Sequence, residues 1–118
     1  MACWVVLTTV LSHVRGLNFG ATPIVWRAQG ISMEPGIVPG DEELTFVQDF
    51  SALRPGTIVI FRPQGKWTTH SFVCHRIVRG FSGEWVTRGD NNAQEDPGYL
   101  TAGNYVATVR FVMHVPQR

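Results

Sequence analysis

The chain has 118 residues and a formal net charge of +1, with ten Lys and Arg against nine Asp and Glu. This length fits one domain with a real core, and the absence of a basic excess argues against nucleic-acid binding. Charged residues make up only 16% of the chain, which is low for a freely soluble protein, and there are no repeats or low-complexity tracts.

The first 20 residues are predicted to form a short apolar N-terminal segment, followed by one domain over 21–118. Residues 1–11 are apolar and uncharged, but His13 and Arg15 follow at once. A membrane span needs about 20 residues, so this stretch is too short to cross a bilayer alone. Three interpretations remain open: the outer end of a truncated membrane helix, an interfacial anchor, or the first packed segment of the domain. A cleavable signal peptide is disfavoured because no basic region opens the chain.

Beyond residue 20 the pattern is β throughout, with no convincing helical period. Stretches rich in Val, Ile, Phe, Thr and Trp are separated by Gly and Pro. The predicted strands are 23–29, 44–48, 57–62, 71–79, 84–87 and 105–115. We therefore predict an all-β (mostly β) domain of small, coiled antiparallel sheets closing toward a barrel.

Three motifs carry groups with catalytic potential: SMEP at 32–35, HRIV at 75–78 and GDNNAQED at 89–96. Together they supply a hydroxyl, an imidazole and two carboxylates. A hydroxyl is a poor nucleophile at neutral pH and needs a base within hydrogen-bond reach, and that base needs a group that selects its tautomer. The motifs thus predict Ser32 as nucleophile and His75 as base.

The turn formers around Ser32 and the two aspartates complete this prediction. Pro and Gly are dense after Ser32, which predicts a rigid, exposed elbow for the hydroxyl. Asp90 and Asp96 are both candidates for the carboxylate beside His75, and either can instead cap a turn.

In order and separation, these motifs resemble the type I signal peptidase family, in the branch whose general base is histidine. That branch includes the endoplasmic-reticulum enzyme and archaeal and some Gram-positive relatives. The resemblance runs from about residue 25 to residue 116 and is tight only at the three motifs. Asp96 falls at the family's final acidic position, so the resemblance favours Asp96 as the third triad member. Asp90 is then a supporting or structural carboxylate.

Lysine usage separates the two branches of this superfamily. The other branch uses a Ser/Lys dyad, and a lysine base must be buried to lose its proton near neutral pH. The one lysine of this chain, Lys66, lies in a Gly-containing stretch that is typical of a hairpin loop. We predict that Lys66 is solvated and that the base is His75.

A thiol-protease interpretation is disfavoured. Adjacent strand residues point to opposite faces, so Cys74 and His75 cannot form a working pair. Cys74 is predicted to pack in the core, on the face of Phe72 and Val78. A disulfide between Cys3 and Cys74 stays open, although we interpret both as free thiols.

No metal or organic cofactor is predicted for this chain. The histidines outside the HRIV motif show no metal-ligand spacing with one another; they are His13, His70 and His114.

The resemblance implies a serine endopeptidase that removes signal peptides from secreted and membrane preproteins. It implies an extended substrate with small residues one and three positions before the cut, docked as an added strand on an exposed sheet edge. The implied partners are preproteins, the membrane lipid surface and membrane subunits of unknown identity. The catalytic domain is expected on the extracytoplasmic or lumenal side of a membrane, as a minimal or truncated form of a membrane enzyme.

Residues around the nucleophile are the expected substrate-binding set. Many relatives carry a hydroxyl that assists the oxyanion where this chain has Gly30; the Ser32 backbone N–H remains, and Gly30 permits close approach of substrate backbone. Apolar neighbours are expected either to line the small-residue pockets or to rest against lipid headgroups. The expected contact residues are Gly30, Ile31, Met33, Pro35, Ile37 and Val38.

Two other classes of function remain as alternatives. A self-cleaving repressor-type protease domain would cut a small-residue site before its serine, but no Ala-Gly precedes Ser32 and Ala102-Gly103 follows it. A degenerate, non-catalytic β module could act as a binding or assembly subunit, but retention of all four polar site residues counts against it.

Overall fold

The computed structural model describes residues 3–10 and 23–116 of the chain. Its strands are β1 (Trp4–Val10), β2 (Ile24–Gln29), β3 (Glu42–Phe46), β4 (Ile58–Phe61), β5 (Val73–Phe81), β6 (Glu84–Arg88), β7 (Tyr99–Leu100) and β8 (Tyr105–Met113). One turn of 3₁₀ helix, Phe50–Ala52, follows β3. The class is therefore mostly β, as predicted.

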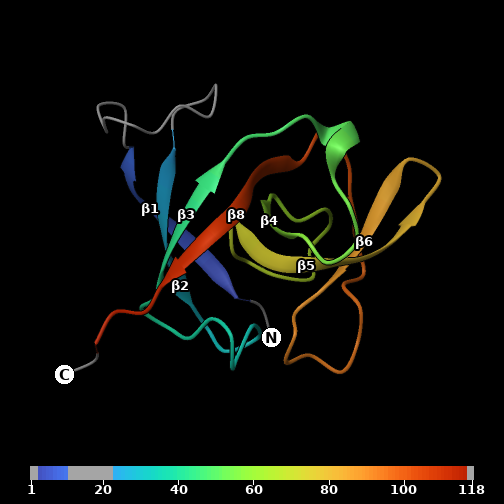
Figure 1. Cartoon of the computed structure of the whole chain (residues 1–118). Helices are drawn as coiled ribbons and strands as arrows, with labels where there is room; N and C mark the ends of the chain where they lie inside the picture. Colours follow the sequence, from blue (N-terminus) through green and yellow to red (C-terminus); the bar gives the residue numbers. More distant parts are fainter. Residues whose placement is uncertain (1–2, 11–22, 117–118) are drawn as a thin grey trace.

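The strands form one antiparallel sheet in the order β1-β2-β3-β8-β4-β5-β6-β7. A second pairing, between Trp4 of β1 and Val73 of β5, joins the sheet to itself. The result is a partial ring, from which the β5–β6 hairpin extends (Figure 1). The predicted closure toward a barrel thus rests on a short contact between β1 and β5.

Strand β1 revises the picture of a separate N-terminal segment. Its sequence WVVLTTV is rich in β-branched residues, and it pairs with β2 from Trp4↔Gln29 to Val10↔Ile24. The described part of segment 1–20 therefore belongs to the same sheet as the domain assigned to 21–118. The rest of that segment, with His13 and Arg15, lies outside the described residues.

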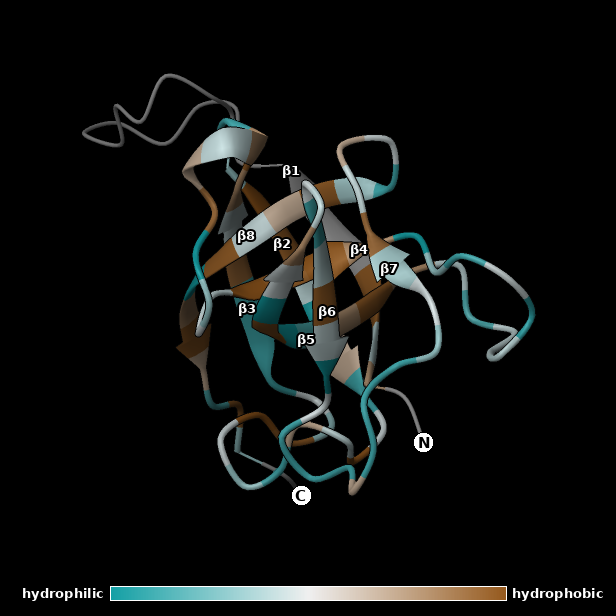
Figure 2. Ribbon diagram, turned by 90° about the vertical axis from the view of Figure 1, so that its right-hand side faces the viewer, coloured by the Kyte–Doolittle hydropathy of each residue, from teal (hydrophilic) through white to brown (hydrophobic). Residues whose placement is uncertain are grey.

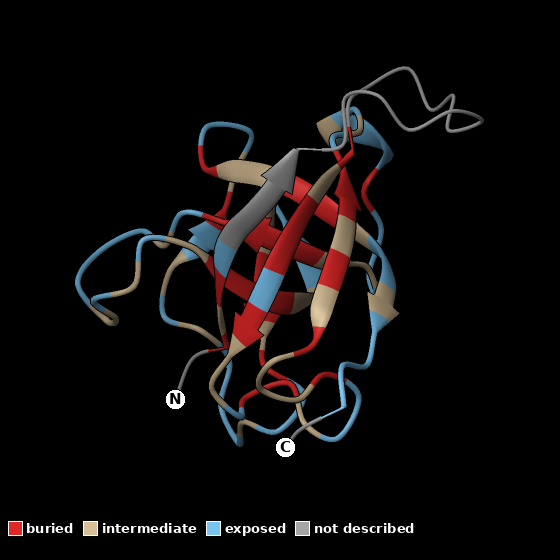
Figure 3. Cartoon of the chain, turned by 90° about the vertical axis from the view of Figure 1, so that its left-hand side faces the viewer, coloured by how far each residue is buried: buried red, intermediate tan, exposed pale blue. Residues whose placement is uncertain are grey.

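The interior divides into two apolar clusters, because β5 sends alternate side chains to opposite sides. Cys74 joins one cluster with Cys3, Val5, Trp26, Ala28, Met33, Ile37 and Ile60. Val73 and Ile77 join the other with Leu53, Val59, Phe61 and Leu100. Apolar and buried residues follow the strands, whereas polar and exposed residues lie mainly on the loops (Figures 2 and 3).

A buried acid sits beside the first cluster. Glu43 on β3 is completely buried, and the Cys74 thiol donates to its Oε1 at 2.8 Å. Burial raises the pKa of Glu43 from 4.5 to about 7; the Cys74 hydrogen bond lowers it and the nearby Asp41 charge raises it. Glu43 therefore holds its proton in the folded chain well above the pH at which it loses it when unfolded.

This difference predicts a pH-dependent stability. Because the folded pKa is the higher one, the contribution of Glu43 is complete below pH 4.5 and is lost as pH rises through about 7. The loss should amount to about 3 kcal/mol of unfolding free energy, and Glu43→Gln should abolish it. Urea unfolding from pH 4.5 to 8 measures it, with Glu42→Gln on the same strand as the control. An unchanged pH slope in Glu43→Gln would contradict the burial argument.

Candidate functional site

The nucleophile candidate lies in a tight loop directly after β2. Gly30 has φ of 75°, a left-handed conformation that turns the chain away from the strand at low steric cost. Two backbone hydrogen bonds then tighten the loop, from Glu34 N–H to Ile31 O at 3.1 Å and from Ile37 N–H to Met33 O at 3.1 Å. Ser32 is thereby held on a constrained backbone.

Ser32 and His75 are hydrogen-bonded to each other. His75 occupies the third position of β5, paired with Val59 of β4, and its Nε2 lies 2.9 Å from Ser32 Oγ. Both residues are completely buried. The ring is flanked by Trp67 and Phe61, whose centroids lie 6.3 and 6.4 Å away. An apolar environment of this kind strengthens the polar contact inside it.

Asp96 contacts the other side of the imidazole. Its Oδ2 lies 2.6 Å from His75 Nδ1, and its side chain is only 4% exposed. Thr87 of β6 bonds to both the side chain and the backbone of Asp96. The Thr87 hydroxyl donates to the carboxylate Oδ2 at 2.7 Å, and Asp96 N–H donates to Thr87 O at 2.8 Å. No role for Thr87 was predicted from the sequence. Its position two residues before the GDNN turn is the signal that could have pointed to it.

The hydrogen-bond network determines the tautomer of His75. An ionised Asp96 carboxylate can only accept, so Nδ1 carries the proton and donates it. The backbone N–H of Cys3, which can only donate, points at Nε2 from 3.4 Å. Nε2 is therefore the acceptor for the Ser32 hydroxyl, which is the arrangement needed for proton removal from a nucleophile.

Asp90 has a different partner. It accepts two hydrogen bonds from Arg76, at 2.9 Å from Nε and 2.8 Å from Nη2, in a partly exposed ion pair. The Arg76 hydrogen bonds lower the pKa of Asp90, partial burial opposes them, and the charge of Arg76 adds to the lowering. Of the two candidate aspartates, the structure brings Asp96 to His75 and places Asp90 on Arg76.

The predicted exposed elbow is wrong, because Ser32 is completely buried. The GDNN turn packs onto it: Asn91 N–H donates to Ser32 O at 2.7 Å, and a Cβ at Gly89 would lie 2.7 Å from the same oxygen. Only a glycine permits this approach. Gly89 therefore contributes to the site through packing.

The apolar neighbours of Ser32 divide between core and surface. Met33 and Ile37 are buried in the first apolar cluster, and Asp90 N–H donates to Met33 Sδ at 3.3 Å. We correct the expectation that these two side chains line surface pockets or rest against lipid, since the core encloses them. Ile31 and Pro35 are exposed, and Gly30 and Val38 are partly buried.

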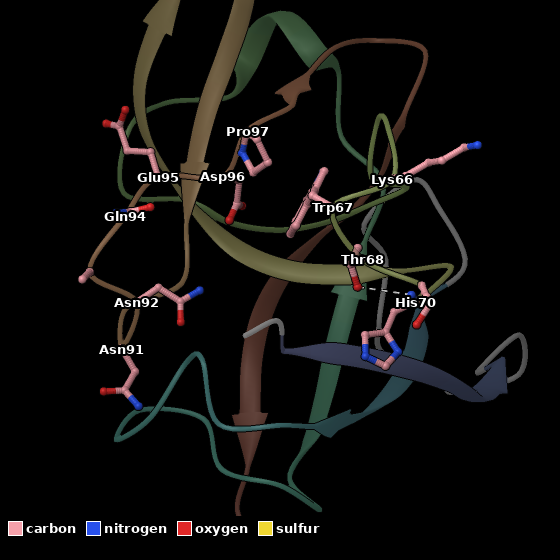
Figure 4. Close-up of a pocket in the computed structure, with 12 residues that line it drawn as sticks. Lys66, Trp67, Thr68, His70, Asn91, Asn92, Gln94, Glu95, Asp96 and Pro97 are labelled. Atoms are coloured by element: carbon pink, nitrogen blue, oxygen red, sulfur yellow. Dashed lines mark hydrogen bonds between the residues drawn. The ribbon is translucent and has the colours of Figure 1, made fainter.

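Lys66 and the two cysteines lie apart from the reacting atoms. Lys66 is exposed in the loop between β4 and β5 and points away from Asp96 (Figure 4). That loop and the segment 91–97 enclose an open pocket of about 800 Å³, with Asp96 in its wall. Cys3 and Cys74 are both free and buried, and Cys74 faces Glu43.

Comparisons with family models, with curated proteins and with solved structures gave no match to this chain. Within the described residues, no group of three or more His, Cys, Asp and Glu side chains could hold a metal ion. The described part of the chain also has no helix long and apolar enough to span a membrane.

The Asp90–Arg76 pair predicts a small effect on stability. Because its folded pKa is depressed, Asp90 stabilises the chain above its ordinary pKa of 3.8, and this contribution is lost as pH falls through the folded value. Asp90→Asn should cost less than about 1 kcal/mol at pH 7, since exposed ion pairs are screened by solvent. Thermal or urea unfolding at pH 7 and pH 2.5 measures this. A larger cost, or one that persists undiminished at pH 2.5, would contradict the ion-pair assignment.

Proposed function

We propose that this protein is a serine endopeptidase of the signal-peptidase type, which cleaves signal peptides from preproteins after small residues. The observation that carries the proposal is the continuous chain of hydrogen bonds from Ser32 through His75 to Asp96, at 2.9 and 2.6 Å. The three residues come from the three motifs on which the family resemblance rests. Their spacing and their buried, aromatic surroundings support a Ser/His/Asp mechanism.

In the proposed reaction, Ser32 Oγ attacks the carbonyl carbon of the scissile peptide bond while His75 Nε2 takes the hydroxyl proton. Asp96 stabilises the imidazolium through Nδ1–H. The tetrahedral intermediate then collapses, the C–N bond breaks, and Nε2 gives its proton to the leaving amine. Water, deprotonated by the same nitrogen, hydrolyses the acyl-enzyme and releases Ser32. No metal or organic cofactor takes part.

Two features of the loop around Ser32 are proposed to serve this chemistry once the site is open. The Ser32 backbone N–H would donate to the oxyanion, and Gly30, which has no side chain, would let substrate backbone pass beside it. The proposed substrate is an extended peptide with small residues at positions one and three before the cut. Preproteins, a lipid surface and membrane subunits are the proposed partners, with the catalytic domain on the extracytoplasmic or lumenal side.

The direct test is cleavage of a presequence with an Ala-x-Ala site by the purified chain in a membrane-mimetic detergent. Ser32→Ala and His75→Ala should each abolish most cleavage, and the double variant should be scarcely slower, because residues that act as a unit are non-additive. Lys66→Ala is the matched control and should keep near-wild-type activity. Near-full activity in either single variant would rule out the Ser/His pair, and cleavage of the chain itself alone would favour the repressor-type alternative.

The aspartates and Thr87 give a second test. Asp96→Asn should lower kcat by up to roughly 10⁴-fold, as in chymotrypsin-type triads, because the amide selects the wrong imidazole tautomer. Thr87→Val should lower kcat by roughly tenfold, since it removes a hydrogen bond to the carboxylate, and Thr87→Ser should restore activity. Thr108→Val is the control, because Thr108 is also buried and its hydroxyl is hydrogen-bonded to Tyr105. A larger kcat loss in Asp90→Asn than in Asp96→Asn would reverse the assignment.

A further inference from the structure

Beside His75, the two edges of strand β5 are covered differently. One edge is paired with β4, through Val59↔His75 and its neighbours. On the opposite edge, β6 pairs with β5 only from Arg76 onward. Residues 73–75 are instead met by the N-terminal segment, through the Trp4↔Val73 pairing and a 2.8 Å hydrogen bond from Cys74 N–H to Cys3 O.

The same N-terminal residues lie over the reacting atoms. Cys3 N–H points at His75 Nε2 from 3.4 Å, the nitrogen that also contacts Ser32 Oγ. Ser32, His75 and Cys3 are all completely buried. A scissile carbonyl must come within about 3–3.5 Å of the attacking oxygen, and a buried hydroxyl does not permit that approach. The structure is thus a closed state with respect to an external peptide.

The closing contact between β1 and β5 is much shorter than the other contact of β1. β1 pairs with β2 along its whole length, whereas its pairing with β5 is confined to Trp4↔Val73. The indole of Trp4 adds to this short contact by stacking on the His70 ring, with centroids 3.8 Å apart and planes 10° apart. His70 belongs to the loop before β5, so the stack holds the N-terminal segment against the His75 strand.

We propose that residues 3 and 4 are an intramolecular cover over the Ser32–His75 pair, and that an extended peptide substrate displaces them to pair with residues 73–75 of β5. The occupant is a peptide because the uncovered edge offers backbone N–H and C=O groups, which an added strand satisfies. Because only open molecules can bind the peptide, the apparent affinity would be the intrinsic affinity multiplied by the fraction of molecules that are open. This inference rests on the proposed function for the identity of the displacing peptide.

The test weakens the cover in the full chain and measures both opening and peptide binding. Trp4→Ala and His70→Ala remove the stack from either side, and Trp4→Phe retains it. Trp85→Ala is the matched control, because it removes an indole of β6 that pairs with Gly80 and takes no part in the stack. Hydrogen exchange at the Cys74 amide reports opening. The affinity for an extended peptide with Ala at positions one and three before the cut is measured in a Ser32→Ala background, so that no cleavage interferes.

Exchange at Cys74 and peptide affinity should both rise about five-fold in Trp4→Ala and His70→Ala, the ratio expected for loss of one aromatic stack. Trp4→Phe and Trp85→Ala should behave like the parent chain. Unchanged exchange in both stack variants, faster exchange without tighter binding, or no peptide binding by any variant would overturn the cover. Tighter binding combined with no cleavage by the Ser32-containing chain would instead refute only the proposed peptidase function.

Discussion

The buried imidazole of His75 is the group on which the arrangement of this protein depends. A ring removed from water needs partners for both nitrogens, and leaving either one unpaired would cost free energy. Asp96 meets Nδ1, while Ser32 and the Cys3 amide meet Nε2. These partners come from the loop after β6, the loop after β2 and the start of the chain. One buried side chain thus ties three segments, distant in sequence, to strand β5.

Strand β5 separates two buried polar networks of different character. On one side, Asp96 receives hydrogen bonds from His75 and Thr87, both good donors to an anion. On the other side, Glu43 receives one from the weak Cys74 thiol donor, and its Oε2 has no partner among the described residues. Burial therefore dominates and raises the pKa of Glu43 to about 7. Adjacent residues of β5, Cys74 and His75, thus bond to two different carboxyl groups, Glu43 and Asp96.

Closure and the proposed activity make opposite demands at the contact between β1 and β5. An uncovered strand edge invites pairing with other chains, so covering residues 73–75 protects the folded protein. The proposed cleavage of a peptide would require the same edge and the buried hydroxyl of Ser32 to become accessible. The contact consists of the Trp4↔Val73 pair, two hydrogen bonds of the Cys3 backbone and one aromatic stack, so it closes the ring with few interactions to break. The stable core lies elsewhere, in the two apolar clusters on either side of β5.

The sequence by itself determined the β class, the approximate positions of six strands and the residue types of the candidate site. Local pattern was sufficient there, because β-branched residues between Gly and Pro have a short-range structural meaning. Local pattern could not assign β1, since an uninterrupted apolar run suits a buried strand or a helix equally well. It also could not detect β7, which has only two residues, Tyr99–Leu100.

The residue pattern alone left open which carboxylate meets His75, where the family resemblance favoured Asp96, and it wrongly predicted an exposed Ser32; the tertiary structure decided both. Asp90 and Asp96 lie in the same loop, and their separation followed from Arg76 binding one while Thr87 and His75 bound the other. Gly89 and Asn91, which are remote from Ser32 in the chain, pack against it in the folded protein. Contacts between residues so far apart depend on how whole strands pack, and no local pattern encodes that packing.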